Sequence, residues 1–227
     1  MQFLEFSFIG LRAARHVLTD PDGGRTITLF PMVHLGEAAF YDAVHNAAAQ
    51  HEAVVIEGAA SPVTRRLTRA YRWIAPGRLG LIVQPKFSTE ATSIISGDLT
   101  AAQFEALWRV APWRERAVLE SAATLVGLWR RITATRHNLG RGLCTSDLKD
   151  RDDILMWNER RAPLLQALIE ARDRILCDTV TKILSEPSGS SSIAVIYGAG
   201  HMGALARSLD HKGFVVTKSD WLTVFET

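Results

Sequence analysis

The sequence has only two cysteines among its 227 residues, Cys144 and Cys177, and no long apolar run. Two cysteines without metal-type spacing are typical of reduced, buried thiols, so no disulfide framework is expected. The longest apolar stretch, residues 122–129, is far shorter than the roughly 20 residues of a membrane-spanning helix, so we expect no membrane span. The N-terminus lacks a basic segment followed by a long apolar one, so we expect no signal peptide and a cytoplasmic location.

The sequence also lacks a large excess of charge of either sign. The 26 basic and 24 acidic residues leave a formal net charge of only +2, so nothing in the composition requires a nucleic-acid partner. Arginine outnumbers lysine 21 to 5, which we interpret as codon usage. The hydrophobic content of 47% is that of an ordinary globular protein with a sizeable core.

The most informative pattern lies near the C-terminus, in residues 191–220. A β-rich apolar run at residues 193–197 predicts a strand, and the glycine-rich segment 198–203, GAGHMG, follows it directly. A short helical pattern and a second strand, residues 214–217, complete the unit. His201 therefore lies where a strand passes into a helix, which is where open α/β sheets usually bind ligands.

A second unit with the same layout lies near the N-terminus. Residues 27–33 predict a strand that ends at His34, and Gly36 precedes an amphipathic helix over residues 38–50. The next strand, residues 53–56, ends in Glu57 and Gly58 and so places a carboxylate at a further strand end. Two such units in one sheet would bring both histidines to the same edge.

The remaining sequence predicts how the sheet is completed. An antiparallel hairpin is expected around the turn at residues 20–24, DPDGG, because proline presets φ and glycine accepts positive φ. We therefore predict a mixed α/β fold: a single domain over residues 1–227, with a core of residues 1–60 plus 147–227 and a helical insertion at about 61–146. Within that core, a helix is expected from Pro163 to about Ser185.

The predicted insertion consists mainly of amphipathic helices. Helix starts are expected at Ser61-Pro62, at residues 98–100 and at Pro112-Trp113. The tryptophans that recur at helical spacing are interpreted as core residues, or as a cap over the sheet edge. The arginines at positions 65, 66, 69 and 72 are interpreted as a solvated face, with an anionic-ligand surface as the alternative.

Two histidines and a carboxylate at one sheet edge would suit a divalent metal. Imidazole nitrogen and carboxylate oxygen together bind Zn, Mn, Co or Fe, and a site with few protein ligands leaves positions open for water. His34, His201 and Glu57 are therefore the candidate metal ligands. A metal that lowers the pKa of bound water and polarises a carbonyl supports hydrolysis.

A competing motif overlaps this one. Residues 198–203 match G-x-G-x-x-G after a strand, and Asp220 follows Gly198 by 22 residues, which is the dinucleotide fingerprint spacing. The unit is followed by only seven residues after Asp220, however, and a histidine in the tight turn would crowd a pyrophosphate. Dinucleotide binding is therefore the less favoured alternative.

Three segments together resemble the TraB/GumN/Tiki superfamily, which is related to the erythromycin esterase and ChaN-like proteins. They are residues 34–36, HLG, residues 54–58, VVIEG, and residues 197–203, YGAGHMG. Residues 198–201 match the second G-x-x-H motif of the family, whereas residues 31–34, PMVH, carry proline in place of the first glycine. Residues 158–161, NERR, resemble the charged segment of the family, with Arg161 where asparagine is common.

The resemblance implies a mixed α/β fold with pseudo-twofold repeats and a divalent-metal hydrolase. Tiki members act as Mn- or Co-dependent proteases, whereas other relatives bind ligands or inhibit a peptide pheromone. The resemblance also implies that Arg160 is the arginine of the charged segment.

The main hypothesis is a metal-dependent hydrolase, with a metallopeptidase as one form of it, acting on a peptide or small-molecule substrate with Mn, Co or Zn. His34 and His201 would be ligands, Glu57 a third ligand or the general base, and Arg160 the stabiliser of the oxyanion. The alternative is a non-catalytic protein that binds a peptide, haem or another small ligand. A homodimer is compatible with the sequence. Backbone support is expected from Gly36, Gly58, Gly198 and Gly200.

Overall fold

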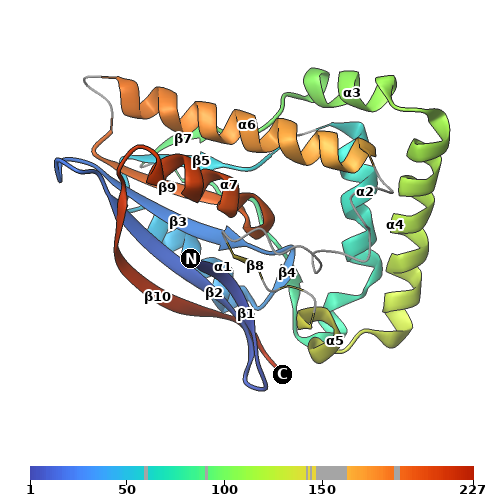
Figure 1. Ribbon diagram of the computed structural model, residues 1–227. Helices are drawn as coiled ribbons and strands as arrows, with labels where there is room; N and C mark the ends of the chain where they lie inside the picture. Colours follow the sequence, from blue (N-terminus) through green and yellow to red (C-terminus); the bar gives the residue numbers. More distant parts are fainter. Residues whose placement is uncertain (59–60, 90–91, 142, 144, 147–162, 187–189) are drawn as a thin grey trace.

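The computed structural model describes residues 1–58, 61–89, 92–141, 143, 145–146, 163–186 and 190–227. It is a mixed α/β structure, as the sequence predicts (Figure 1). Its elements in chain order are β1 (Gln2–Phe6), β2 (Gly10–Thr19), β3 (Thr26–Met32), β4 (Leu35–Gly36), α1 (Ala38–Ala48), β5 (Ala53–Ile56), α2 (Pro62–Trp73), η1 (Pro76–Leu79), β6 (Ile82–Val83), β7 (Ser93–Ser96), α3 (Ala101–Val110), α4 (Trp113–Thr133), α5 (Arg136–Gly140), β8 (Thr145–Ser146), α6 (Pro163–Ser185), β9 (Ser192–Gly198), α7 (Ala199–Asp210) and β10 (Val215–Glu226).

The centre of the main sheet is parallel. Strands β7, β5, β9 and β3 lie side by side in that order and run in the same direction. Strand β9 therefore lies between β3 and β5, with Pro31 opposite Tyr197 on one side and Ile56 opposite Ile196 on the other. Strand β9, which leads to His201, therefore separates β5, which precedes Glu57, from β3, which precedes His34.

The other half of the sheet is antiparallel. The predicted hairpin is confirmed, since β2 pairs with β3 across a turn in which Gly23 has φ of +72° and donates its N–H to the Asp20 carbonyl at 3.0 Å. Strand β10 runs along all of β2, whereas β3 and β1 pair with opposite halves of β2. The two histidine units therefore differ in their last strand, because β5 is parallel to its neighbours and β10 is antiparallel to β2.

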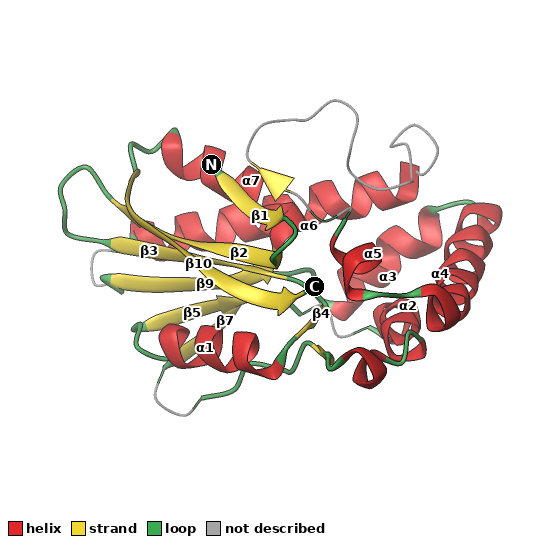
Figure 2. Ribbon diagram, turned by 90° about the horizontal axis from the view of Figure 1, so that it is seen from below, coloured by secondary structure: helices red, strands yellow, loops and turns green. Residues whose placement is uncertain are grey.

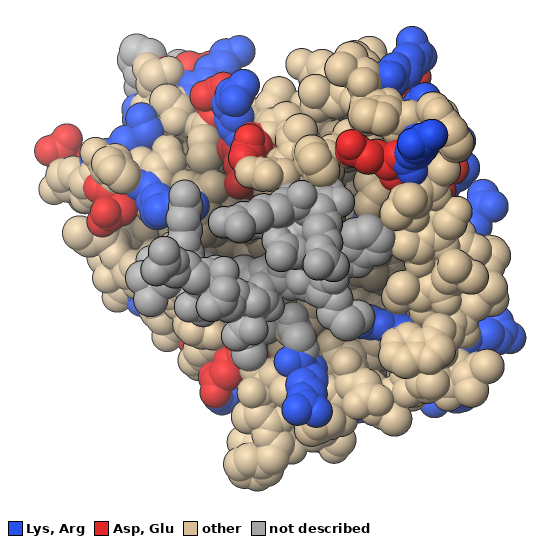
Figure 3. Space-filling view, turned by 45° about the vertical axis from the view of Figure 1, so that its right-hand side comes forward, with Lys and Arg blue, Asp and Glu red and all other residues tan. Residues whose placement is uncertain are grey.

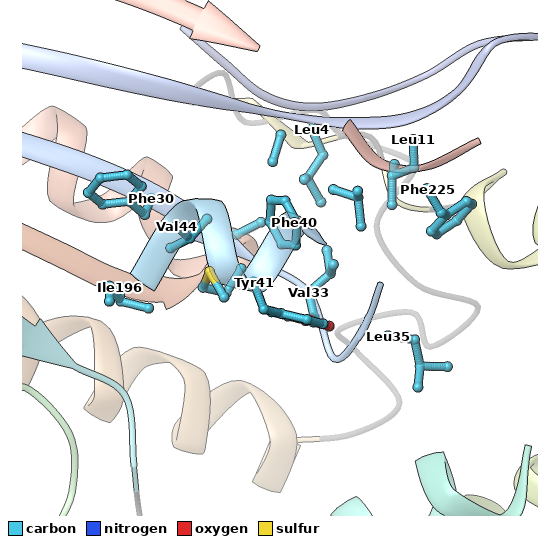
Figure 4. Close-up of a cluster of buried hydrophobic side chains, with 14 of the residues drawn as sticks. Leu4, Leu11, Phe30, Val33, Leu35, Phe40, Tyr41, Val44, Ile196 and Phe225 are labelled. Atoms are coloured by element: carbon cyan, nitrogen blue, oxygen red, sulfur yellow. The ribbon is translucent and has the colours of Figure 1, made fainter. Parts of the chain in front are cut away.

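Helices cover both faces of the parallel strands. Helices α6 and α7 lie on one face and α1 lies on the other (Figure 2). Strand β9 is apolar throughout because Val195 faces the α6–α7 layer while Ile196 faces α1. On the α1 side, Phe40 and Val44 pack in the same cluster as Phe30 and Ile196 (Figure 4).

Helices α2, α3, α4 and α5 form a lobe beyond the carboxyl ends of the parallel strands (Figure 1). The predicted starts of α2, α3 and α4 are confirmed, and Ser61 and Thr100 each form a capping box. The expected insertion is not helical throughout, because it also supplies β7, which pairs with β5 in the main sheet. The prediction of core tryptophans holds for Trp108 but is wrong for Trp113 and Trp129, which are exposed.

In the described part of the chain, no helix is both long enough and apolar enough to cross a membrane.

Candidate functional site

The carboxyl ends of four parallel strands meet at one edge of the sheet, and this edge faces the helical lobe (Figure 1). A polar residue or a glycine turn follows each strand. The sequence predicted three of these positions, but it did not indicate the fourth, the carboxylate after β7. His34 comes after β3, Glu57 after β5 and Asp98 after β7. His201 lies in the first turn of α7, just after β9.

Glu57 is held firmly at this edge. Its Oε1 accepts a hydrogen bond from Arg172 Nη2 at 2.5 Å, and its Oε2 accepts one from the backbone N–H of Gly198 at 2.6 Å. Burial alone would raise the pKa of Glu57, but Arg172, together with His34 and His201, lowers it below its ordinary value. Glu57 is therefore ionised at neutral pH and already paired with a cation.

Arg172 on α6 bridges two carboxylates. Its Nε and Nη2 each donate to an oxygen of Asp98 at 2.9 Å, and Nη2 also reaches Glu57. The Asp98 side chain is fully inaccessible to solvent and accepts further bonds from the N–H groups of Leu99 at 2.7 Å and Gly58 at 3.1 Å. Burial would raise the pKa of Asp98, yet these donors lower it. The three charges form one buried network.

His201 in the first turn of α7 is buried and oriented by a carboxylate. Its Nδ1 lies 2.6 Å from Asp173 Oδ1 on α6, and the Tyr197 ring packs edge-on against the imidazole at 5.2 Å between centroids. A neutral imidazole that donates Nδ1–H to a carboxylate directs the lone pair of Nε2 outwards. Such an arrangement is typical of metal-binding histidines and of general bases.

His34 completes the edge from the β3 side. Its ring lies 4.4 Å from the ring of Tyr71 on α2, so it bridges the sheet and the helical lobe. The His34 side chain is accessible to solvent, yet surrounding protein partly desolvates it and lowers its pKa. Glu57 opposes this shift, while Arg172 and His201 add to it. His34 is therefore neutral at pH 7.

The backbone around His34 is anchored on both sides. The hydroxyl of Tyr41 on α1 donates to the Val33 carbonyl at 3.0 Å, and the N–H of Gln84 donates to the His34 carbonyl at 2.9 Å. Gly36 pairs with Ile82 in the small β4–β6 sheet. These bonds fix where the chain leaves β3 and hence where the imidazole lies.

The four glycines expected to support the site have different roles. At Gly198, an added Cβ would lie 2.9 Å from Glu57 Oε2, so glycine allows the carboxylate to approach the backbone. A Cβ added at Gly36 would lie 3.0 Å from Val224 Cγ1. Gly58 supplies an N–H to Asp98, and an added Cβ at Gly58 or Gly200 would meet no atom within 4 Å. Gly200 thus leaves the first turn of α7 open.

These residues suit a divalent metal in kind but not in arrangement. His34, His201 and Glu57 interact electrostatically, yet the described residues include no group of three or more His, Cys, Asp or Glu that could hold an ion. Both Glu57 oxygens already accept hydrogen bonds, one of them from the Arg172 cation. As the edge is arranged, Glu57 would have to exchange Arg172 for an ion before these three residues could hold a metal.

Arg160, the predicted oxyanion stabiliser, lies outside the described residues. The arginine that the structure places at the edge is Arg172, which the sequence analysis missed together with Asp98 and Asp173. A signal was present, because Arg172 lies midway between Leu168 and Leu176 and interrupts the buried stripe of α6 at i, i+4, i+8 spacing. A charge in such a stripe indicates a buried ionic partner.

Alanine at position 198 is expected to destabilise the protein by about 1–3 kcal/mol, because its Cβ would push Glu57 away from the Gly198 N–H and leave buried polar groups without partners. Gly200→Ala is the matched control in the same helical turn. It meets no atom within 4 Å, and we expect it to be neutral or to stabilise α7 by up to about 1 kcal/mol. Urea unfolding of both variants measures the difference. Equal free energies of unfolding would contradict the role given to Gly198.

Acid is expected to destabilise the fold. Burial lowers the pKa of His34, His45 and His51 below the ordinary 6.5, so the unfolded chain binds more protons as the pH falls through 6.5 and stability is lost there. The lowered pKa values of Glu57 and Asp98 contribute stability above their ordinary 4.5 and 3.8, which is lost as the pH falls through the folded values. Calorimetry should show Tm falling from about pH 7 to pH 5. A constant or rising Tm would contradict this.

The dinucleotide interpretation lacks the geometry that it requires. Asp220 lies on β10, which is antiparallel to β2 and does not neighbour β9, and Asp220 is paired with Arg15. An acidic residue that binds a ribose would instead follow the strand next to the glycine turn. Comparison of the sequence with protein-family models and with curated proteins found no match.

Proposed function

We propose that the protein is a hydrolase that cleaves a peptide or another small carbonyl-containing substrate at the carboxyl edge of the sheet. The observation that carries the proposal is the hydrogen bond of 2.6 Å between His201 Nδ1 and Asp173, beside the Glu57–Arg172 pair. A buried imidazole oriented by a carboxylate is suited to general-base catalysis. The resemblance to the TraB/GumN/Tiki superfamily supports the same class of reaction.

His201 would act as the base. Its Nε2 would take a proton from water as the water oxygen attacks the carbonyl carbon of the substrate. The C–O or C–N bond to the leaving group would then break, and the proton on Nε2 would pass to that group. Asp173 and the ionised Glu57 would stabilise the imidazolium between these two proton transfers.

The oxyanion that forms on the substrate would need positive partners. Gly198, the N-cap of α7, has no side chain to accept hydrogen bonds from the N–H groups of the first turn, and Gly200 leaves that turn open. Backbone N–H groups at a helix N-terminus stabilise negative charge. We assign this role to the start of α7, and Arg160 stays a second candidate for it.

Glu57 is better suited to holding the site together than to acting as its base. Its lowered pKa makes it a weak proton acceptor, and both of its oxygens are engaged. Its negative charge orients Arg172. In this proposal Glu57 and Arg172 are positioning residues.

A metal-dependent version is a second proposal, favoured by the placement of His34, His201 and Glu57 after the ends of adjacent parallel strands. His34, His201 and Glu57 would hold Mn, Co or Zn if Glu57 exchanged Arg172 for the ion. A metal bound there would supply a Lewis acid. The cytoplasmic location predicted from the sequence belongs with both versions as a proposal.

A substrate screen tests the proposal. Purified protein is assayed on p-nitrophenyl esters and on fluorogenic peptides, first with EDTA and then with added Mn²⁺, Co²⁺ or Zn²⁺, beside the Asp173→Asn variant. Turnover in EDTA that falls in the variant supports the base mechanism, and turnover only with added metal supports the second version. No turnover under any of these conditions, with haem or a peptide retained on the protein, would replace both versions by the ligand-binding alternative.

A further inference from the structure

Helix α4 presents its apolar side chains to solvent. Val118, Leu125, Trp129 and Ile132 recur at helical spacing and so lie along one face of the helix. Leu125, Trp129 and Ile132 are 65%, 60% and 81% exposed. Together with Leu128, these four residues are called the α4 stripe. The sequence pattern predicted a buried face here, and the structure turns that face outwards.

The opposite face of α4 packs on the protein through Leu119, which contacts the cluster around Phe104 and Trp108, and through the buried Gly127. Glu120 pairs with Arg66 of α2 at 3.0 Å, and Arg116 is half-buried. Arg130 lies close enough to Tyr71, which contacts His34, to lower the pKa of that phenol against the larger effect of burial. A rotation of α4 that buried the stripe would expose Leu119 and Gly127, so the packing of this face determines the orientation of the helix.

An exposed stripe of this size needs a partner surface. Monomeric proteins rarely expose contiguous apolar patches larger than a few hundred Å², and such patches on a polar background usually mark interaction sites. The stripe spans 15 residues from Val118 to Ile132, a rise of about 21 Å along the helix axis. Figure 3 shows a mainly tan surface on the right, where α4 comes forward, with blue side chains at its margin.

The charge around the stripe indicates the charge of the surface that would bind it. Helices α2 and α4 carry eight arginines and two glutamates, a net charge of +6, whereas the rest of the chain has a net charge of −4. Arg66 and Arg69 line the shallow groove of about 220 Å³ between the two helices, next to Thr124 of α4. A second copy of the chain docked on the stripe would bring like charges together. An anionic surface would instead be attracted.

We propose that the α4 stripe docks on an anionic lipid bilayer. Leu125, Trp129 and Ile132 would enter the boundary between headgroups and acyl chains, and exposed arginines, Arg69 of α2 and Arg131 of α4 among them, would contact the anionic headgroups. An amphipathic helix with Trp and Leu on one side and arginines beside them lies in the plane of the interface. The helix would lie on the membrane rather than across it.

Vesicle sedimentation tests this proposal without reference to catalysis. The full chain is mixed with vesicles of phosphatidylcholine alone and of phosphatidylcholine with about 30% phosphatidylglycerol. We expect binding to the anionic vesicles only, weakened by about 0.5 M NaCl because salt screens the arginines. In the double variant Leu125→Gln/Trp129→Gln the partition coefficient should fall by about tenfold or more, since two large apolar side chains no longer enter the bilayer.

The matched control is Phe8→Gln, which removes an exposed aromatic ring at the tip of the β1–β2 hairpin, away from α4. It should bind as the unchanged chain does. Circular dichroism and Tm should be the same for all variants, because the three side chains are exposed. Failure to bind anionic vesicles, equal loss of binding in the control, or a homodimer in light scattering that the double variant dissociates would each overturn the proposal.

Discussion

The His201→Gln variant is expected to lose about 10²–10⁴-fold in kcat while it keeps its fold. Glutamine preserves the approximate volume and polarity of the side chain at this nearly buried position, but it cannot accept a proton at neutral pH. The proposed step transfers a proton from water to Nε2, so the chemical step should suffer far more than substrate binding. Steady-state kinetics on a substrate found in the screen would show this as a fall in kcat with little change in KM.

Two further variants separate catalysis from structure. Asp173→Asn should lower kcat less than His201→Gln and change the pH profile, because Asp173 acts through the orientation of the imidazole. His211→Gln, at the exposed end of the same helix, should have no effect on kcat. Undiminished activity in His201→Gln would eliminate this histidine as the base and direct attention to His34.

Replacing Arg172 by methionine is expected to have the largest effect on stability, a loss of about 3–5 kcal/mol. Methionine retains much of the side-chain length, but it leaves Glu57 and the inaccessible Asp98 without their common cation. The two carboxylates would then have to take up protons or rearrange. Their pKa values should rise, so the loss of stability should be greater at pH 8 than at about pH 5.

The matched control for this prediction is the exposed ion pair between Arg109 and Glu105 on α3, at 3.0 Å. Arg109→Met should change the free energy of unfolding by no more than about 0.5 kcal/mol, because water solvates both partners. The combined change Glu57→Gln/Arg172→Met should recover part of the stability lost in Arg172→Met, since it removes one of the two orphaned charges. If Arg172→Met cost no more than Arg109→Met, the buried network would not contribute as argued.

Local sequence patterns determined most of the individual elements. The turn around Gly23 requires a residue that tolerates positive φ, and Ser61 and Thr100 mark helix starts because their hydroxyls cap the first turn. Local patterns also determined the placement of His34 and His201 after strands, because the apolar runs stop just before them. The structure brings both histidines and Glu57 to one edge, as the matching layout of the two units predicted.

The order of the strands and the partners of each charge were decided only in the tertiary structure. Strand β9 comes late in the chain, yet it lies between β3 and β5, and β10 then pairs with β2 rather than with a strand of the parallel half. Arg172 meets Glu57 from 115 residues away, and Asp98 from 74. Helical periodicity identifies an apolar face of α4 but not the direction in which it points, which depends on the packing of Leu119 and Gly127 against the rest of the lobe. Hydrogen bonds within a helix or turn depend on residues a few positions apart, whereas ion pairs and strand order depend on contacts between distant segments, which periodicity and spacing do not encode.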